Sequence, residues 1–212
     1  MNKYLLVIIA FAASTFCKGQ SITDKHLVTE KNYKKYSKFN QSIDPLKPDY
    51  ATLNACMLFA INEQRVKHHL TVLPWHISLE TAAYFHSKAM ADYNFFSHYN
   101  MLDSNRMNAE SRGALAGIRN SLMGECIAES SLTKPTYLGM CEVFINLWMN
   151  SEPHRKIVLS ENANAIGVGF YFNEKMDLYA TLDVQCYKIL IYDVQQAKDK
   201  LPFSSWFDAS KL

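Results

Sequence analysis

The sequence contains no apolar run of the length that a membrane-spanning helix needs, and charge of neither sign is in large excess. An unbroken apolar run extends from Leu5 to Ala13, well short of the roughly 20 residues that cross a bilayer. The formal net charge is only +2, which is too small to predict nucleic acid or an anionic membrane as a partner. We therefore expect neither a transmembrane anchor nor a nucleic-acid site.

Several sequence motifs of catalysis and metal binding are also absent. No CxxC or CxxH spacing occurs, which argues against a structural zinc site built from thiolates. Neither a Gly-x-Ser-x-Gly nucleophile turn nor a His-Glu-x-x-His zinc-peptidase helix is present. Any catalytic site in this chain would therefore lack a nucleophile that the sequence identifies.

Cysteine is scarce, and its state is not fixed by the sequence. Cys17 falls in the N-terminal segment and leaves Cys56, Cys126, Cys141 and Cys186. In an exported chain these four residues allow alternative disulfide pairings, between which spacing does not choose. They are equally consistent with four buried thiols, because free cysteine is among the most buried residue types.

Residues 1–19 have the layout of a secretory signal peptide, with a basic residue, a short apolar stretch and small residues near the end. Cleavage after Gly19 would make Gln20 the first residue of the mature chain. We therefore predict a secreted or periplasmic protein. Acylation of Cys17 as a lipoprotein is the alternative, which the bulky Phe16 disfavours.

The remaining length of about 190 residues is typical of one domain. Residues 20–48 are polar and lysine-rich and predict an N-terminal extension that does not contribute to the core. Residues 49–187 are expected to form the domain. Residues 188–212 contain too many apolar residues for a free linker, so we expect the last strand to continue to about Tyr192 and the aromatic side chains beyond it to pack on the domain.

Apolar residues recur at helical spacing in three segments of the domain. The predicted helices run from Asp49 to about Val66, from Ser78 to about Tyr93 and from Tyr137 to Met149. Residues 100–122, between the second and third helices, are predicted to form a polar loop with one short helical turn. Pro153 is expected to stop the third helix.

Strand patterns are fewer and shorter. Residues 125–129 predict one strand, and residues 166–170 and 178–187 predict a hairpin whose turn lies at 173–175. Helices interleaved with a few antiparallel strands indicate an α+β layered domain.

Two histidines and one glutamate are the candidate site. His98 follows the second predicted helix, Glu125 begins a strand, and His154 follows the third helix. Two imidazoles and a carboxylate could hold a divalent metal such as Zn²⁺ with one position open, or act as a general acid/base pair without metal. Alternatively, each of the three could be a buried structural residue with satisfied hydrogen bonds. We interpret His86 as a core or cleft-edge histidine.

A set of short motifs, in fixed order over roughly residues 50–187, resembles the bacterial branch of the CAP superfamily. This superfamily includes the cysteine-rich secretory proteins, the antigen 5 venom proteins and the plant pathogenesis-related 1 proteins. The resemblance implies a three-layer α-β-α sandwich with a small central antiparallel sheet and a cleft. The motifs are Asn62-x-x-Arg65, Leu73-x-Trp75, Phe96-Ser97-His98, Gly124-Glu125, Trp148-x-x-Ser151-x-x-His154-Arg155 and Ile166-Gly167-Val168-Gly169.

Carried over by motif, the cleft residues would be His98, Glu125, Ser151 and His154. Two departures stand out, since Cys126 replaces the usual asparagine and Ser151 falls where eukaryotic members have a second glutamate. A third departure is the segment Leu182-Asp183-Val184-Gln185, which lacks the second eukaryotic histidine. The resemblance therefore implies only part of the family's group of two histidines and two acids.

From these features we expect an exported binding or interaction module that uses the His/Glu cleft or an adjacent groove. Its partner would be a lipid, a small ligand or an extracellular protein. The alternative is a metal-assisted or acid/base hydrolase that acts on peptides or cell-envelope material. No cofactor is required by the binding function, and Zn²⁺ is the metal that His98, Glu125 and His154 would hold.

Overall fold

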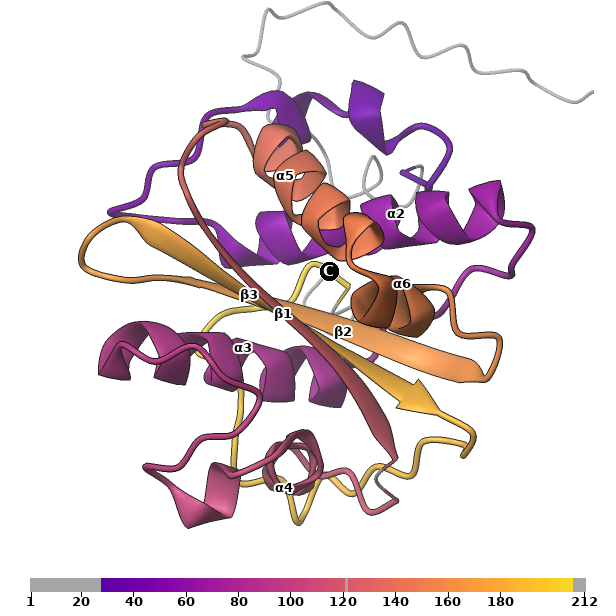
Figure 1. Ribbon diagram of the computed structural model, residues 1–212, viewed down its shortest axis with the longest axis vertical. Coiled ribbons are helices and arrows are strands. Elements are labelled where there is room, and N and C mark those ends of the chain that lie inside the picture. Colours follow the sequence, from indigo (N-terminus) through magenta and orange to yellow (C-terminus); the bar gives the residue numbers. More distant parts are fainter. Residues whose placement is uncertain (1–27, 121, 208–212) are drawn as a thin grey trace, which may run out of the picture.

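The computed structural model describes residues 28–120 and 122–207. The predicted signal peptide at residues 1–19 lies outside the described residues. Among the described helices, none is both long and apolar enough to cross a membrane. Figure 1 shows three layers, with helices on both faces of a small sheet, as the α-β-α expectation requires.

The sheet has three antiparallel strands, β1 (Met123–Ser131), β2 (Ala163–Phe172) and β3 (Asp177–Cys186). β3 is central, in the order β1-β3-β2. The predicted hairpin is present as β2 and β3, and its turn is held by Asn173 Oδ1, which accepts hydrogen bonds from the amides of Lys175 and Asp177 at 2.9 and 2.8 Å.

One face of the sheet is covered by α2 (Tyr50–Lys67), α5 (Tyr137–Asn150) and the short α6 (Glu152–Val158). The main hydrophobic core fills this interface, and Trp148 is fully buried in it. The opposite face is covered by α3 (Ile77–Tyr93), with α4 (Ala109–Leu115) beyond it (Figure 1). Three short 3₁₀ helices complete the described elements: η1 (Tyr33–Lys35), η2 (Ser37–Asn40) and η3 (Ser104–Arg106).

The predicted helix ends agree with the capping chemistry. Asp49 caps α2 by accepting a hydrogen bond from the Thr52 amide at 3.0 Å, as side chains at this position often do. A ring nitrogen of His76 accepts one from the Ser78 amide at 3.2 Å. α3 ends at Asn94, whose left-handed backbone, with φ 53°, is a common helix terminator.

Helix α3 lies unusually close to β2 because two strand residues have no side chain. A Cβ atom on Gly167 would lie 2.0 Å from the Glu80 nitrogen, and one on Gly169 would lie 2.1 Å from the Tyr84 nitrogen. The glycines of the Ile166–Gly169 motif therefore allow the helix backbone to pack directly on the strand.

Three sequence predictions about boundaries are wrong. Pro153 does not stop a helix, because α5 already ends at Asn150 and the proline occupies the first turn of α6, where it costs no hydrogen bond. The last strand ends at Cys186, and Tyr187 takes a left-handed backbone with φ 62°, so no strand continues to Tyr192.

The third error concerns the segment predicted as an extension. Tyr33, Phe39 and Ile43 are buried in the main core. Despite the lysines between them, the rings of Tyr33 and Phe39 pack against that of Phe59 in α2. Because residues 20–48 are polar overall, the sequence did not identify these three residues as part of the core.

The C-terminal segment links both helical layers. The amides of Lys198 and Asp199 donate to the carbonyl of Leu115 in α4, while the ring of Trp206 packs 5.3 Å from that of Phe39 on the far side of the sheet. Between them, Ser205 Oγ donates to buried Glu80 at 2.6 Å. The aromatic end of the chain is therefore docked on the domain.

All four cysteines within the described residues are buried free thiols. Cys141 of α5 faces α2, where its Sγ lies 3.6 Å from the carbonyl of Leu53. The structure thus corresponds to the buried-thiol alternative.

Candidate functional site

The two histidines and the glutamate singled out by the sequence lie together. His98 follows α3, Glu125 lies on β1 and His154 lies on α6. His98 Nδ1 is 2.8 Å from Glu125 Oε1, and the rings of His98 and His154 have centroids 6.5 Å apart. We call His98 and His154 the imidazole pair.

The carboxylate of Glu125 forms the buried base of this site. Its side chain is 6% exposed, whereas that of His98 is 45% exposed. Because a carboxylate only accepts hydrogen bonds, His98 Nδ1 carries the shared hydrogen. The Nε2 atom is then the ring nitrogen that Glu125 leaves free for a ligand.

Arg112 of α4 provides the positive charge that keeps Glu125 ionised. Its guanidinium is buried and pairs with Glu125 Oε2, and it also donates to the carbonyls of His98 and Arg106, at 3.3 and 3.0 Å. Burial alone raises the pKa of Glu125, but the His98 hydrogen bond and the Arg112 charge outweigh it and lower that pKa. Arg112 therefore fixes both the charge of Glu125 and the loop that carries His98.

Two more titratable groups lie beneath the site. Asp183 on β3 faces Glu125 across the strand pair, and burial, followed by the charge of Glu125, raises its pKa well above the usual value. His86 of α3 has Nε2 3.8 Å from Glu125 Oε1, and burial lowers its pKa to about 4. A neutral Asp183 and a neutral His86 thus surround one Arg112–Glu125 ion pair.

This buried cluster leaves several polar atoms without a partner among the described residues. They are His86 Nδ1, Arg112 Nε and both carboxyl oxygens of Asp183. Since unpartnered buried polar atoms are costly, a protonated Asp183 that donates to Glu125 accounts for one of them.

The remaining sequence candidate, Ser151, lies at the start of α6, three residues before His154. It caps the helix without a side-chain hydrogen bond. Cys126, which replaces the family's asparagine, is buried with its Sγ 3.7 Å from the carbonyl of His154. Cys126 therefore contacts the backbone of α6, whereas no hydrogen bond among the described residues links Ser151 to either imidazole.

The three-ligand metal site does not fit this arrangement. No three histidine, cysteine, aspartate or glutamate side chains in residues 28–120 and 122–207 are placed to hold a metal ion. Both oxygens of Glu125 are already engaged, by Arg112 and His98, and a guanidinium beside the carboxylate repels a second cation. Of the three predicted ligands, only the two imidazoles therefore remain available to a metal ion.

Sequence reasoning missed Arg112 and Asp183 as parts of the site. Arg112 stood in a segment read as a polar loop, where a single arginine is usually solvated. Thr181, Asp183 and Gln185 alternate with apolar residues along β3, a pattern typical of a solvent-facing strand, yet all three are fully buried beneath α3 and α4. That run of polar residues in a central strand is the one sequence feature that pointed to a buried polar cluster.

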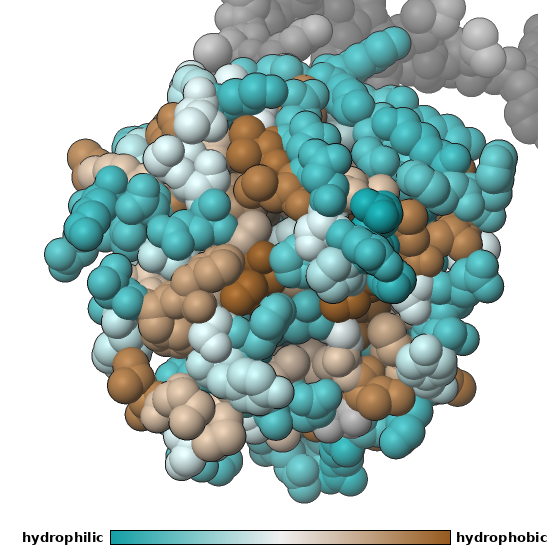
Figure 2. All heavy atoms as spheres, in the orientation of Figure 1, coloured by the Kyte–Doolittle hydropathy of each residue, from teal (hydrophilic) through white to brown (hydrophobic). Residues whose placement is uncertain are grey.

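The protein surface around these elements is mixed in character. Figure 2 shows hydrophobic and hydrophilic residues interspersed on the face that carries β1, α5 and α6, with separate brown groups divided by teal and white ones. This face therefore presents no large continuous apolar area of the kind that marks a membrane or lipid surface.

Comparison with known proteins places this geometry in a family. Residues 58–184 match the family model described as the cysteine-rich secretory protein family, CAP. Two proteins of Bacillus subtilis are similar. An uncharacterised membrane protein, YlbC, is 28% identical over 80% of this chain and 45% of its own length. An uncharacterised protein, YkwD, is 32% identical over 51% of this chain and 38% of its own length. The chain thus spans less than half the length of these curated relatives.

Solved structures show the same fold. An extracellular SCP-domain protein of Bacillus anthracis superimposes with a TM-score of 0.54 at 27% identity, over 68% of this chain and 45% of its own. An outer surface protein of Borrelia burgdorferi gives a TM-score of 0.51 at 17% identity, over 62% of this chain and 91% of its own. The family-model match over residues 58–184, together with the ordered motifs and the three-layer sandwich, establishes that the chain belongs to the CAP superfamily.

Proposed function

We propose that this protein is an exported binding module that holds a small polar ligand at the imidazole pair. The observation that carries the proposal is the engagement of Glu125 on both sides, by Arg112 and by His98. A carboxylate held in this way orients His98 and leaves its Nε2 as a hydrogen-bond acceptor for a ligand. Among lipid, small-ligand and protein partners, the polar side chains and the mixed surface favour the small ligand.

Export is part of the proposal. The layout of residues 1–19 supports it, and the two structural relatives are described as extracellular and as an outer surface protein. Intact mass of the protein recovered from the periplasm or medium tests this step. A mature chain that starts at Gln20 is expected, and a diacylated Cys17 would instead make it a lipoprotein.

The ligand site is tested by thermal unfolding with a panel of small carboxylates, polyols and amines, and separately with Zn²⁺. A compound that binds only the folded chain raises the melting temperature by mass action. We expect at least one organic compound to do so in the wild type and to lose the effect in His98→Ala. His68→Ala is the matched control, because His68 is exposed at the end of α2.

Two results would contradict this proposal. An organic compound whose effect is unchanged in both His98→Ala and His154→Ala would bind elsewhere. A melting temperature that responds to Zn²⁺ alone, and loses that response in His98→Ala, would make the imidazole pair a metal site.

An acid/base hydrolase is the second candidate, and one contact favours it. The 2.8 Å bond from His98 to buried Glu125 orients an imidazole in the way that general bases require. Water would then be the nucleophile, because no serine or cysteine among the described residues is hydrogen-bonded to His98. Hydrolysis of peptide or cell-envelope substrates by the wild type, abolished in His98→Gln, would favour this function.

A further inference from the structure

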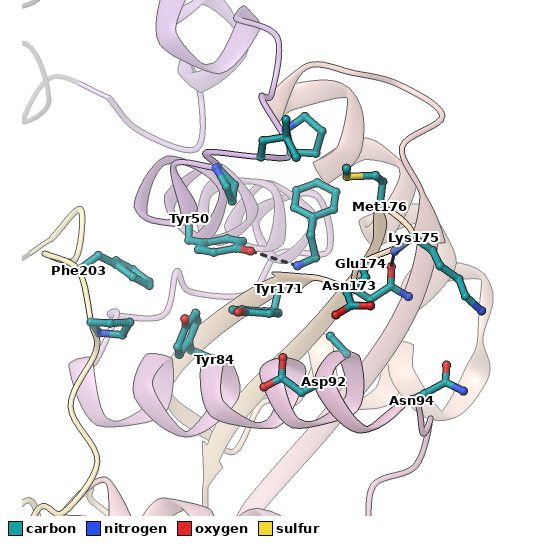
Figure 3. Close-up of a pocket in the computed structure, with 16 residues that line it drawn as sticks. Tyr50, Tyr84, Asp92, Asn94, Tyr171, Asn173, Glu174, Lys175, Met176 and Phe203 are labelled. Atoms are coloured by element: carbon teal, nitrogen blue, oxygen red, sulfur yellow. Dashed lines mark hydrogen bonds between the residues drawn. The ribbon is translucent and has the colours of Figure 1, made fainter.

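A cavity of about 1150 Å³ lies apart from the imidazole pair. Four segments build it: the stretch that leads into α2, the C-terminal half of α3, the β2–β3 hairpin and the C-terminal segment. Figure 3 shows Tyr50, Tyr84, Tyr171 and Phe203 on one side, with Asp92, Asn94 and Glu174 on the other. None of His98, Glu125 and His154 contributes to its walls.

The aromatic wall is rigid without a ligand. The rings of Tyr50 and Tyr171 stack with centroids 5.5 Å apart, and those of Tyr84 and Phe203 meet edge to face at 5.2 Å. The Phe172 amide donates to Tyr50 Oη at 3.1 Å, which ties α2 to β2. A wall fixed in this way loses little conformational entropy on binding.

The opposite wall is polar and carries charges of both signs. Asp92, Asn94, Glu174 and Lys175 are exposed, and Lys88 pairs with Asp92 while its Nζ lies 4.6 Å from the centre of the Tyr171 ring. Because Asp92 is paired with Lys88 and Glu174 lies beside Lys175 in the lining, the cavity selects neither an anion nor a cation. Carboxylates and amides along one side also make a poor environment for a hydrocarbon chain.

A neutral sugar chain combines the two surfaces that this cavity offers. Its C–H faces suit the apolar faces of tyrosine and phenylalanine rings. Its hydroxyls suit carboxylates, which accept hydrogen bonds, and amides, which both donate and accept them. The volume lies just above the range of about 300–1,000 Å³ typical of small-molecule pockets, which leaves room for several linked rings.

We propose that this cavity, which we call the tyrosine pocket, binds a short neutral oligosaccharide. Six of its lining residues lie outside the family match at residues 58–184, so the pocket is completed by segments on both sides of the matched region. They are Pro45, Leu46, Pro48, Tyr50, Pro202 and Phe203. This second site makes the protein able to attach to a glycan while the imidazole pair is free for another ligand.

The test is calorimetric titration of the full mature chain with two neutral tetrasaccharides, of N-acetylglucosamine and of glucose, and with palmitate. We expect at least one tetrasaccharide to bind. Tyr171→Leu and Asp92→Asn should each weaken binding at least tenfold, equivalent to about 1.4 kcal/mol. Tyr187→Leu, at a tyrosine that is 68% exposed away from the pocket, and His98→Ala should leave the affinity unchanged.

Other results overturn the proposal. Absence of binding by both tetrasaccharides at millimolar concentration would do so, as would equal binding by the Asp92→Asn variant and the wild type. Binding of palmitate alone, with loss in Tyr171→Leu, would make the pocket a lipid site. Asp92→Asn keeps the size of an exposed side chain and removes its charge together with the ion pair to Lys88, so it remains informative even where Tyr171→Leu disturbs the fold.

Discussion

Asp183 and Glu125 face each other across β1 and β3, and only one of these carboxyl groups has a cation to pair with. Arg112 neutralises Glu125, while no described donor reaches either oxygen of Asp183. A second negative charge in this position would be both desolvated and repelled. The fold therefore favours the protonated form of Asp183 and raises its pKa well above the usual value, a role that the sequence pattern of a single aspartate in a strand does not indicate.

This protonation gives a pH dependence with a definite sign. Because the pKa of Asp183 is raised in the folded chain, the folded state holds a proton that the unfolded state releases above about pH 4. The contribution of Asp183 to the free energy of unfolding is fully present below that pH and is lost as the pH rises toward the raised pKa. Asp183→Asn cannot titrate, so its free energy of unfolding relative to wild type should increase by about 1.4 kcal/mol per pH unit over this window.

Urea denaturation of both proteins between about pH 4 and about pH 7 measures this difference. The neighbouring His86 titrates in both proteins, so its opposite slope cancels in the comparison. Glu161→Gln, at an exposed position, is the control and should show no such trend. A difference between Asp183→Asn and wild type that stays constant with pH would mean that Asp183 is ionised in the fold.

At the scale of single residues, motif context was the informative part of the sequence. His98, Glu125 and His154 were placed by their motifs, and they do meet. Arg112 and Asp183 carry no motif, and their roles depend on which charges the fold brings together. For the same reason the metal interpretation did not follow from the residue types, since the cation beside Glu125 could not be foreseen.

Among the elements, α5 is anchored by one tryptophan. Trp148 is fully buried, whereas its neighbour Leu147 is 45% exposed. Trp148→Ala should lower the free energy of unfolding by about 3–5 kcal/mol, while Leu147→Ala should change it by less than about 1 kcal/mol. Chemical denaturation decides the matter, and similar losses in the two variants would place the tryptophan outside the core.

Helix α3 depends on the two glycines of β2. Gly167→Ala would put a methyl group 2.0 Å from the Glu80 backbone nitrogen, so the helix must move away from the sheet. We expect a loss of about 3 kcal/mol or more, at the upper end of overpacking effects. Gly124→Ala is the control, since its nearest contact is the Ile157 side chain at 3.1 Å, and thermal unfolding that ranks the two equally would be inconsistent with backbone contact at Gly167.

Element positions were largely predictable because periodicity and caps are local. α2, α3, α5 and the β2–β3 hairpin follow the predicted spans closely. The errors arose where tertiary contacts decide the outcome. Pro153 lies in the first turn of α6, and three apolar residues of the lysine-rich segment 20–48 pack in a core that the local composition does not reveal.

The molecule as a whole is closed by its two end segments. Phe39 of η2 and Trp206 of the C-terminal segment pack with ring centroids 5.3 Å apart, and both are buried. Phe39→Ala and Trp206→Ala should each cost about 3 kcal/mol or more. The double variant should lose less than the sum by roughly 0.5–1.5 kcal/mol, the range for an aromatic pair. A double-mutant cycle in denaturant measures this coupling, and strict additivity would show that the segments dock independently.

The contact between Tyr36 and Trp206, with ring centroids 5.6 Å apart, also has a topological consequence. The N-terminal and C-terminal segments of the described chain meet at this contact, an arrangement that favours insertion of the whole domain into another protein. A host protein that carried this domain as an insertion would therefore need attachment points that allow the segments around Tyr36 and Trp206 to meet. A piece cut at residues 58 and 184 would lack both ends of this clasp and would leave Phe59 without the partners that shield it from water.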